Sequence, residues 1–367
     1  MGLRDYYRQF AGMSDEEVSE QLREEAAERR RKALTKVEAL DLSQTTWHEL
    51  PHPDVVAAVT FAVRGRLNLP HDPTGEELRA ALSRRHGLPA GRIAVGHGAA
   101  QLLAAAAQAL LRPGDELITP WPSYRLYPLM AQRAGAQATP VPGGHDVARL
   151  RAAVSERTRV IALCNPNDPT GAYIAPGQLR ALLDDLPERV SVLLDEALVD
   201  FVAADDRDAT VDLLAAHPRL LIFRTFSKAY GLAGLRVGYA LGGPGSEPLM
   251  AQLTPPLGIG LPAQAGALEA LRVCDAQVAE RRATVVRERR RLLERLHELP
   301  VDAAPTEANV AWLSAPGLSA GELTARLRRG GVIAMPGSEV GDDAHVRVAI
   351  QGAAATDRLL DALARAF

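Results

Sequence analysis

The segment that decides the fold spans residues 220–231 and reads LLIFRTFSKAYG. Its first four residues form an apolar run that predicts a buried strand, and a short polar sequence with Lys228 follows. The chain has only three lysines, and the other two, Lys32 and Lys36, lie in a charged stretch near the N-terminus. A lysine just beyond a buried strand is either a surface side chain with a packed stem or a functional amine. Its position alone leaves both interpretations open.

The same pattern, an apolar strand followed by a polar turn and a helix, recurs through the middle of the chain. The further predicted strands span 92–95, 116–119, 160–164 and 190–194. Apolar strands separated by helices predict an α/β fold with a mostly parallel sheet sandwiched by helices. Ligands of such sheets bind at the carboxyl ends of the strands. Several polar residues are expected at those ends, namely Asp168, Asp195, Thr225, Ser227 and Lys228.

The chain divides into an arm and two domains on the same reasoning. Residues 14–36 predict a long exposed helix, because Ser14 and Glu17 form a capping box and Glu/Arg pairs follow at helical spacing. From about residue 275 a charged helix is followed by short strands and two more helices, which is typical of an α+β unit. We therefore predict an N-terminal helical arm over 1–45 that is part of the small domain, a large domain over 46–272 and a smaller α+β domain over 273–367.

Composition excludes several classes of protein. Lys+Arg 42 against Asp+Glu 45 gives a net charge of −3, so no general attraction to nucleic acid is expected. No apolar run approaches the roughly 20 residues of a membrane span, and the N-terminus has no apolar core typical of a secretory signal. Cys164 and Cys274 lie far apart without a metal-binding spacing, which argues against a disulfide framework and a metal site. A cytoplasmic protein is expected.

A turn with small residues follows the strand at 92–95. Gly98, Ala99 and Ala100 open a helix there, and backbone N–H groups at such a point favour an anion. Gln101 stands where a dinucleotide fingerprint has its third glycine, so a nicotinamide dehydrogenase is disfavoured. Arg236, eight residues beyond Lys228, adds a guanidinium for the same anion.

These parts match what pyridoxal 5′-phosphate requires of a protein. Its phosphate needs a cradle, its aldehyde an amine, its ring nitrogen an acid partner and its ring a stacking surface. Lys228 and Asp195 are the candidate amine and acid, and Tyr124 is the candidate stacking residue. Each residue alone also has an ordinary structural interpretation, but their joint placement at strand ends favours the cofactor site.

At this level of detail the chain resembles the class I/II aminotransferases of pyridoxal-phosphate fold type I, and most closely the histidinol-phosphate aminotransferase branch. The resemblance covers the chain from about residue 41 to its end. It rests on ordered motifs: Gly98-Ala99-Ala100, Pro122-Ser123-Tyr124, NPNDPTG at 165–171, Asp195-Glu196-Ala197, Ser227-Lys228 with Arg236, and His345-Val346-Arg347-Val348.

The resemblance implies a role for each residue. Residues 46–272 would be an aspartate-aminotransferase-like cofactor domain, with Lys228 holding the cofactor as a Schiff base and acting as general base. Asp195 would pair with the ring nitrogen, and Arg347 would clamp the substrate α-carboxylate. The other cofactor-binding residues implied are Gly98, Ala99, Ala100, Tyr124, Asp168, Thr225, Ser227 and Arg236.

The resemblance also implies a homodimer that exchanges an amino group between amino acids and keto acids by a ping-pong mechanism. Family members contact the substrate side chain in the segment equivalent to 43–48. Trp47 and His48 are the candidates for that contact in this chain, with ordinary packing as the alternative.

Three positions depart from the family. Asp168 and Leu198 stand where the family has an asparagine and a tyrosine that donate to the cofactor's phenolic oxygen, and no tyrosine occurs near Leu69, where the family places one. Loss of both donors would destabilise the cofactor's phenolate. This predicts a raised pKa for the imine that joins the cofactor to the protein, which a pH titration of the cofactor's visible absorbance would show. Residues 333–335 are apolar where histidinol-phosphate enzymes carry an arginine, which disfavours histidinol phosphate as substrate.

Two alternatives stay open at this point. One is another reaction of the same cofactor, such as decarboxylation, β-elimination or cyclisation, because Arg347 does not say which bond breaks. The other is a cofactor-binding protein with weakened catalysis, which the altered partners of the phenolic oxygen suggest.

Overall fold

The structure is a computed structural model that describes residues 13–14, 18, 23–24, 39–66, 68–143, 145–203 and 208–367. The helix predicted over 14–36 falls mostly outside these residues. Contacts divide the chain after Leu40 into two units, and the second unit, residues 41–367, contains both of the larger sheets. No helix in the described part of the chain has the length and apolar character needed to span a membrane.

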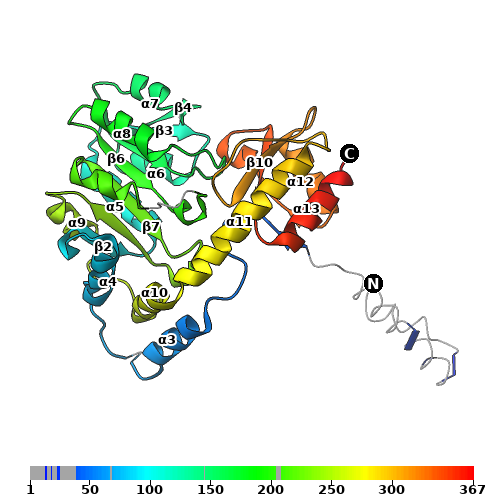
Figure 1. Ribbon diagram of the computed structural model, residues 1–367, viewed down its shortest axis with the longest axis horizontal. Coiled ribbons are helices and arrows are strands. Elements are labelled where there is room, and N and C mark those ends of the chain that lie inside the picture. Colours follow the sequence, from blue (N-terminus) through cyan, green and yellow to red (C-terminus); the bar gives the residue numbers. More distant parts are fainter. Residues whose placement is uncertain are drawn as a thin grey trace. The chain divides into compact units, whose positions relative to one another are not determined.

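A seven-stranded sheet forms the centre of the larger part of the molecule (Figure 1). Pairing is parallel between β7, β6, β5, β3 and β4, whereas β8 runs antiparallel to both β2 and β7. The predicted mostly parallel α/β sheet is therefore confirmed. In spatial order the strands are β2 (Ile93–Gly96), β8 (Gly238–Gly242), β7 (Leu220–Thr225), β6 (Ser191–Asp195), β5 (Thr158–Cys164), β3 (Glu116–Trp121) and β4 (Gln137–Pro142).

Helices flank this sheet because its central strands are apolar on both faces. The largest contact is made by α5 (Ala99–Leu110), whose Leu102, Leu103 and Ala106 belong to one buried cluster with strand residues. The remaining helices of this part are α3 (Pro53–Arg64), α4 (Glu76–His86), α6 (Leu126–Arg133), α7 (Val147–Ala152), α8 (Pro176–Asp185), α9 (Glu247–Leu253) and α10 (Leu261–Val273).

A second, four-stranded antiparallel sheet lies in the C-terminal part of the chain. Its strands in order are β12 (Met335–Pro336), β13 (His345–Ala349), β10 (Val310–Ser314) and β9 (Asp302–Ala303). It is accompanied by α11 (Asp275–Leu296), α12 (Ala320–Arg329) and α13 (Ala353–Ala364). Ser319 and Glu322 form a capping box at the start of α12.

An extended segment after β1 (Leu40–Asp41) is fixed to this C-terminal part. The N–H of Leu42 donates to the carbonyl of Ile333 at 2.9 Å, and the N–H of Ala349 donates to the carbonyl of Leu42 at 2.8 Å. Asn309 Nδ2 donates to the carbonyl of Thr45 at 3.0 Å. These bonds place residues 43–46 where they reach the larger sheet's carboxyl edge.

Candidate active site

Strands β5, β6 and β7 deliver their polar residues to one edge of the sheet. They are parallel neighbours, and the register pairs Cys164 with Asp195 and Asp195 with Phe223. The residues that follow these strand ends therefore lie beside one another, as predicted. Lys228 comes from the turn after β7, and Asp168 comes from the loop after β5.

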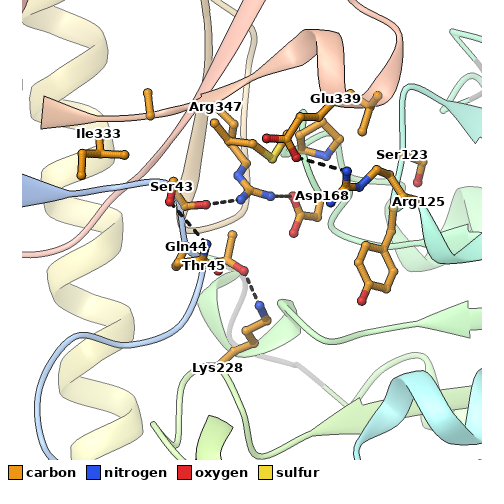
Figure 2. Close-up of a pocket in the computed structure, with 15 residues that line it drawn as sticks. Ser43, Gln44, Thr45, Ser123, Arg125, Asp168, Lys228, Ile333, Glu339 and Arg347 are labelled. Carbon is orange, nitrogen blue, oxygen red and sulfur yellow. Dashed lines mark hydrogen bonds and ion pairs between the residues drawn. The ribbon is translucent and has the colours of Figure 1, made fainter. Parts of the chain in front are cut away.

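The Lys228 amine is the centre of the site. Its Nζ donates to Oγ1 of Thr45, from the segment fixed to the C-terminal part (Figure 2). Burial lowers the pKa of Lys228, while the nearby Asp168 carboxylate raises it and Arg347 lowers it. The amine thus sits in a dry environment that favours its neutral form, as a nucleophile or base requires.

Asp195 is buried at the end of β6 and is held by two donors. The Tyr127 hydroxyl donates to its Oδ2 at 2.9 Å, and the Ala197 N–H donates to its Oδ1 at 3.0 Å. Burial raises the pKa of Asp195 to about 6, although both hydrogen bonds act to lower it. A cation brought to this carboxylate would favour its ionised form.

Sequence reasoning missed Tyr127. It lies three residues after Tyr124 at the start of α6, and the two rings meet edge to face with centroids 5.8 Å apart. This spacing was the only signal in the sequence, and it is equally typical of a core aromatic residue.

The anion cradle forms where β2 meets α5. Gly98 has a φ of +80°, and the backbone N–H groups of Ala99 and Ala100 open the helix beyond it. Arg236 closes the cradle from the left-handed conformation, with a φ of +53°. Its Nη1 contacts Ser227 Oγ at 3.4 Å. A Cβ on Gly98 would lie 2.7 Å from Arg236 Nη2, so the space between them depends on a glycine.

Two adjoining cavities meet at the site. The smaller, of about 160 Å³, contains the cradle, and the larger, of about 430 Å³, opens beyond it. Tyr124, Asp168 and Lys228 line both cavities. The smaller is lined by Thr46, Ala99, Ala100, Tyr124, Cys164, Asp168, Asp195, Ala197, Leu198, Thr225, Ser227, Lys228, Ala233 and Arg236.

The larger cavity has two ion pairs and one apolar wall. Arg347, from β13, donates to Oδ1 of Asp168 and to the carbonyl of Ser43 (Figure 2). Arg125 Nη1 lies 3.2 Å from Glu339 Oε2, a pair that sequence reasoning missed. The apolar wall consists of Ile333, Ala334, Met335 and Val340.

The structure does not bring Trp47 to either cavity. Trp47 is buried, stacks on Phe201 with centroids 6.3 Å apart and lies under the Arg281 guanidinium. Its neighbours Thr45 and Thr46 line the cavities instead. Leu198 lines the smaller cavity, and Leu69 is exposed on the surface.

These residues fit pyridoxal phosphate. The glycine-dependent space beside Arg236 suits a phosphate, the buried Lys228 amine suits an aldehyde, and the buried Asp195 carboxylate suits a protonated ring nitrogen. All three lie around one cavity.

Comparison with known proteins agrees with this chemistry. The family model for aminotransferase class I and II matches residues 37–367. The chain is 39% identical over 330 residues to an aromatic amino acid aminotransferase of Corynebacterium efficiens, covering 89% of this chain and 92% of that protein. It is 34% identical to histidinol-phosphate aminotransferase 2 of Pseudomonas fluorescens, covering 85% of each.

Solved structures of aminotransferases are also similar to this chain. Histidinol-phosphate aminotransferase from Sinorhizobium meliloti in complex with pyridoxal-5′-phosphate superposes with a TM-score of 0.79 at 27% identity, covering 93% of each chain. Aspartate aminotransferase from Thermus thermophilus with maleate also has a TM-score of 0.79, at 26% identity, covering 95% of this chain and 96% of that one.

Proposed function

This chain belongs to the class I and II aminotransferases, which are pyridoxal-phosphate-dependent enzymes of fold type I, and from this premise we propose that its amino donors are aromatic amino acids. The observation that carries the proposal is the apolar wall of residues 333–335 and Val340, which shares a cavity with Lys228 and Arg347. An aromatic side chain buries its ring against such a wall, while its α-carboxylate requires a cation.

Pyridoxal phosphate supplies an aldehyde for the substrate amine and a ring that accepts the electrons left behind by the departing α-proton. Lys228 would hold the cofactor and, once freed, move the α-proton, a role favoured by its lowered pKa. Asp195 would keep the ring nitrogen protonated, and Tyr127 and Ala197 orient that carboxylate. The cradle residues Ala99, Ala100, Thr225, Ser227 and Arg236 would bind the phosphate, and Tyr124 would cover the ring.

The charges of the larger cavity argue against a phosphorylated substrate. Arg347 would bind the substrate α-carboxylate, which leaves Arg125 as the other arginine of the cavity for a substrate phosphate. Arg125 already pairs with Glu339, so a phosphate would have to displace that carboxylate. The relative from Corynebacterium efficiens bears the name of an aromatic enzyme, which supports the same choice.

The test is a half-reaction followed by the cofactor's visible absorbance. The holoenzyme is mixed separately with phenylalanine, aspartate and histidinol phosphate. Phenylalanine is expected to bleach the band with release of phenylpyruvate, and added phenylpyruvate should restore it. Faster bleaching by aspartate or histidinol phosphate would contradict the aromatic assignment. Release of carbon dioxide or ammonia without restoration would indicate a decarboxylase or a lyase, and an unchanging spectrum a binding protein.

The partner we propose is a second copy of this chain. Leu50, Phe61 and Leu257 are the most exposed of the large apolar side chains that the structure describes, at 86%, 83% and 81%. Phe61 lies on α3, which packs against α10, and Leu257 lies in the turn shortly before α10. Figure 1 shows α3 beside α10 at the edge of the larger part. A homodimer would cover this apolar surface.

A further inference from the structure

Arg347 reaches the cavity with its charge already balanced. One of its terminal nitrogens contacts Asp168 and the other contacts the carbonyl of Ser43, while its Nε is buried without a hydrogen-bond partner. The Arg347 and Asp168 side chains are only 10% and 16% exposed, so water screens this pair weakly.

We propose that Asp168 takes up one proton when a substrate carboxylate binds to Arg347. The inference rests on the proposed function, because it takes Arg347 as the carboxylate-binding residue. Before binding, the guanidinium (+1) and Asp168 (−1) sum to zero. An arriving carboxylate would bring the sum to −1 in a poorly hydrated site, and a proton from solvent onto Asp168 restores zero.

The protonated form of Asp168 also suits the geometry. An ionised carboxylate can only accept hydrogen bonds. It would share one guanidinium with the incoming substrate carboxylate, which is also only an acceptor, so the two could not bond to each other. A protonated carboxyl can donate one hydrogen bond as well as accept. The loop that carries Asp168 is fixed by the neighbouring Asn167, whose Nδ2 donates to the Pro122 carbonyl at 3.0 Å and to Thr170 Oγ1 at 2.8 Å.

Other titratable groups surround Asp168. Lys228 follows β7, Asp195 ends β6, Cys164 ends β5, and Tyr124 precedes α6. Asp195 already has two donors directed at its carboxylate, and the Cys164 thiol and Tyr124 hydroxyl are neutral because their pKa values are raised by burial. Asp168 is the carboxylate in direct contact with Arg347, so we assign the proton to it.

The consequence is a pH-dependent affinity for carboxylates. If binding takes up one proton, the Kd rises about tenfold per pH unit over the range in which that proton is taken up. A neutral ligand of the same shape brings no charge to Arg347 and takes up no proton. The Asp168→Asn variant should bind carboxylates without proton uptake, and its Kd should not depend on pH over the same range.

The experiment is titration calorimetry on the full chain loaded with pyridoxamine 5′-phosphate, a form in which no imine to Lys228 can titrate. The probe is 3-phenylpropionate, which has no amino or keto group to react, and 3-phenylpropanol is its neutral counterpart. Measurements in two buffers of different ionisation enthalpy count the protons. We expect about one proton per site for the acid in the wild type and none for the alcohol.

Two variants locate the proton. Uptake should vanish in Asp168→Asn and persist in Glu339→Gln, which neutralises the other paired carboxylate of the cavity. No uptake in the wild type, undiminished uptake in Asp168→Asn, or a loss confined to Glu339→Gln would each overturn the inference. If only an aliphatic acid such as butyrate binds, the aromatic assignment fails and the proton count is made with that acid. If no carboxylate binds, Arg347 is not the carboxylate site and the inference falls.

Discussion

Tyr127 donates its phenolic hydroxyl to Oδ2 of Asp195 at 2.9 Å, between two buried side chains. The Ala197 N–H donates to the other oxygen, so both oxygens of this carboxylate are bound before any ligand arrives. Both donors favour the ionised form, whereas burial opposes it and raises the pKa to about 6. Tyr127 therefore acts on the cofactor through Asp195, by orienting the carboxylate and keeping it charged.

Replacing Tyr127 by phenylalanine removes one of these two donors and leaves the ring in place. We expect the Kd for pyridoxal phosphate to rise roughly tenfold, because a hydrogen bond to a charged group contributes about 1.5 kcal/mol. Titration of the apoprotein, followed by absorbance, measures this change. Tyr124→Phe is the matched control, since it removes a hydroxyl from the neighbouring ring, whereas the hydrogen bonds to Asp195 come from Tyr127 and Ala197. Equal losses in both variants would contradict the role given to Tyr127.

The raised pKa of Asp195 predicts a pH-dependent stability of the apoprotein. Its folded-state pKa of about 6 lies above its ordinary value of 3.8, so the native state binds this proton more tightly than the unfolded state. The resulting stabilisation is fully present below pH 3.8 and is lost as the pH rises through 6.

Asp195→Asn stays neutral throughout this range. The free energy of unfolding of the variant minus that of the wild type should therefore increase by roughly 3 kcal/mol from the low-pH end to the high-pH end of this range. Urea unfolding of both apoproteins at the ends of the range measures the difference. A difference that does not change with pH would show that Asp195 is not destabilised by burial.

Lys228 is predicted to bond covalently to the cofactor. Arginine at this position keeps a positive charge but cannot form an imine, so Lys228→Arg should lower kcat by at least about 10³-fold. Borohydride reduction of the wild-type holoenzyme should fix the cofactor to the peptide that contains Lys228, as read by mass spectrometry. The variant should yield no adduct, and turnover near the wild-type level would refute the assignment.

The fold was predictable because the buried strands are apolar runs and their ends are marked by polar residues. The same rule predicts that Asp195 and Lys228 lie together, and Arg236 joins them around one cavity because the antiparallel β8 begins beside the end of β7. Strand ends in a parallel sheet share one edge whatever the details of the loops. Local sequence was therefore sufficient for this part of the site.

Contacts between distant segments were not predictable. Asp168 and Arg347 are separated by 179 residues, and their ion pair depends on how β13 meets the loop after β5. Thr45 reaches Lys228 only because Leu42 and Asn309 fix its segment to the C-terminal part. Trp47 lies in that irregular segment, where no periodicity in the sequence indicates which side chains face the cavity.

Gly98 tests the anion cradle. An alanine there would place its Cβ 2.7 Å from Arg236 Nη2 and push the guanidinium out of position. We expect Gly98→Ala to raise the Kd for pyridoxal phosphate by at least about tenfold, because a charge-assisted hydrogen bond is lost. Gly87→Ala is the matched control, since Gly87 also has a positive φ, of +65°, but nothing lies within 4 Å of its Cβ position. Both variants should lose stability, and only the first should lose cofactor affinity.

Phe61 tests the proposed homodimer. An aspartate on this exposed face of α3 would have to be buried against the partner, and in a twofold interface the substitution occurs twice. Each site would lose about 1.5–3 kcal/mol of apolar burial and would also place a charge there, so Phe61→Asp should raise the dimer Kd by at least about 10²-fold. Sedimentation velocity over a range of concentrations measures this change. Leu129→Asp is the control, because Leu129 is an apolar side chain 47% exposed on a different helix, α6. A dimer unaffected by Phe61→Asp, or equally weakened by both, would place the interface elsewhere.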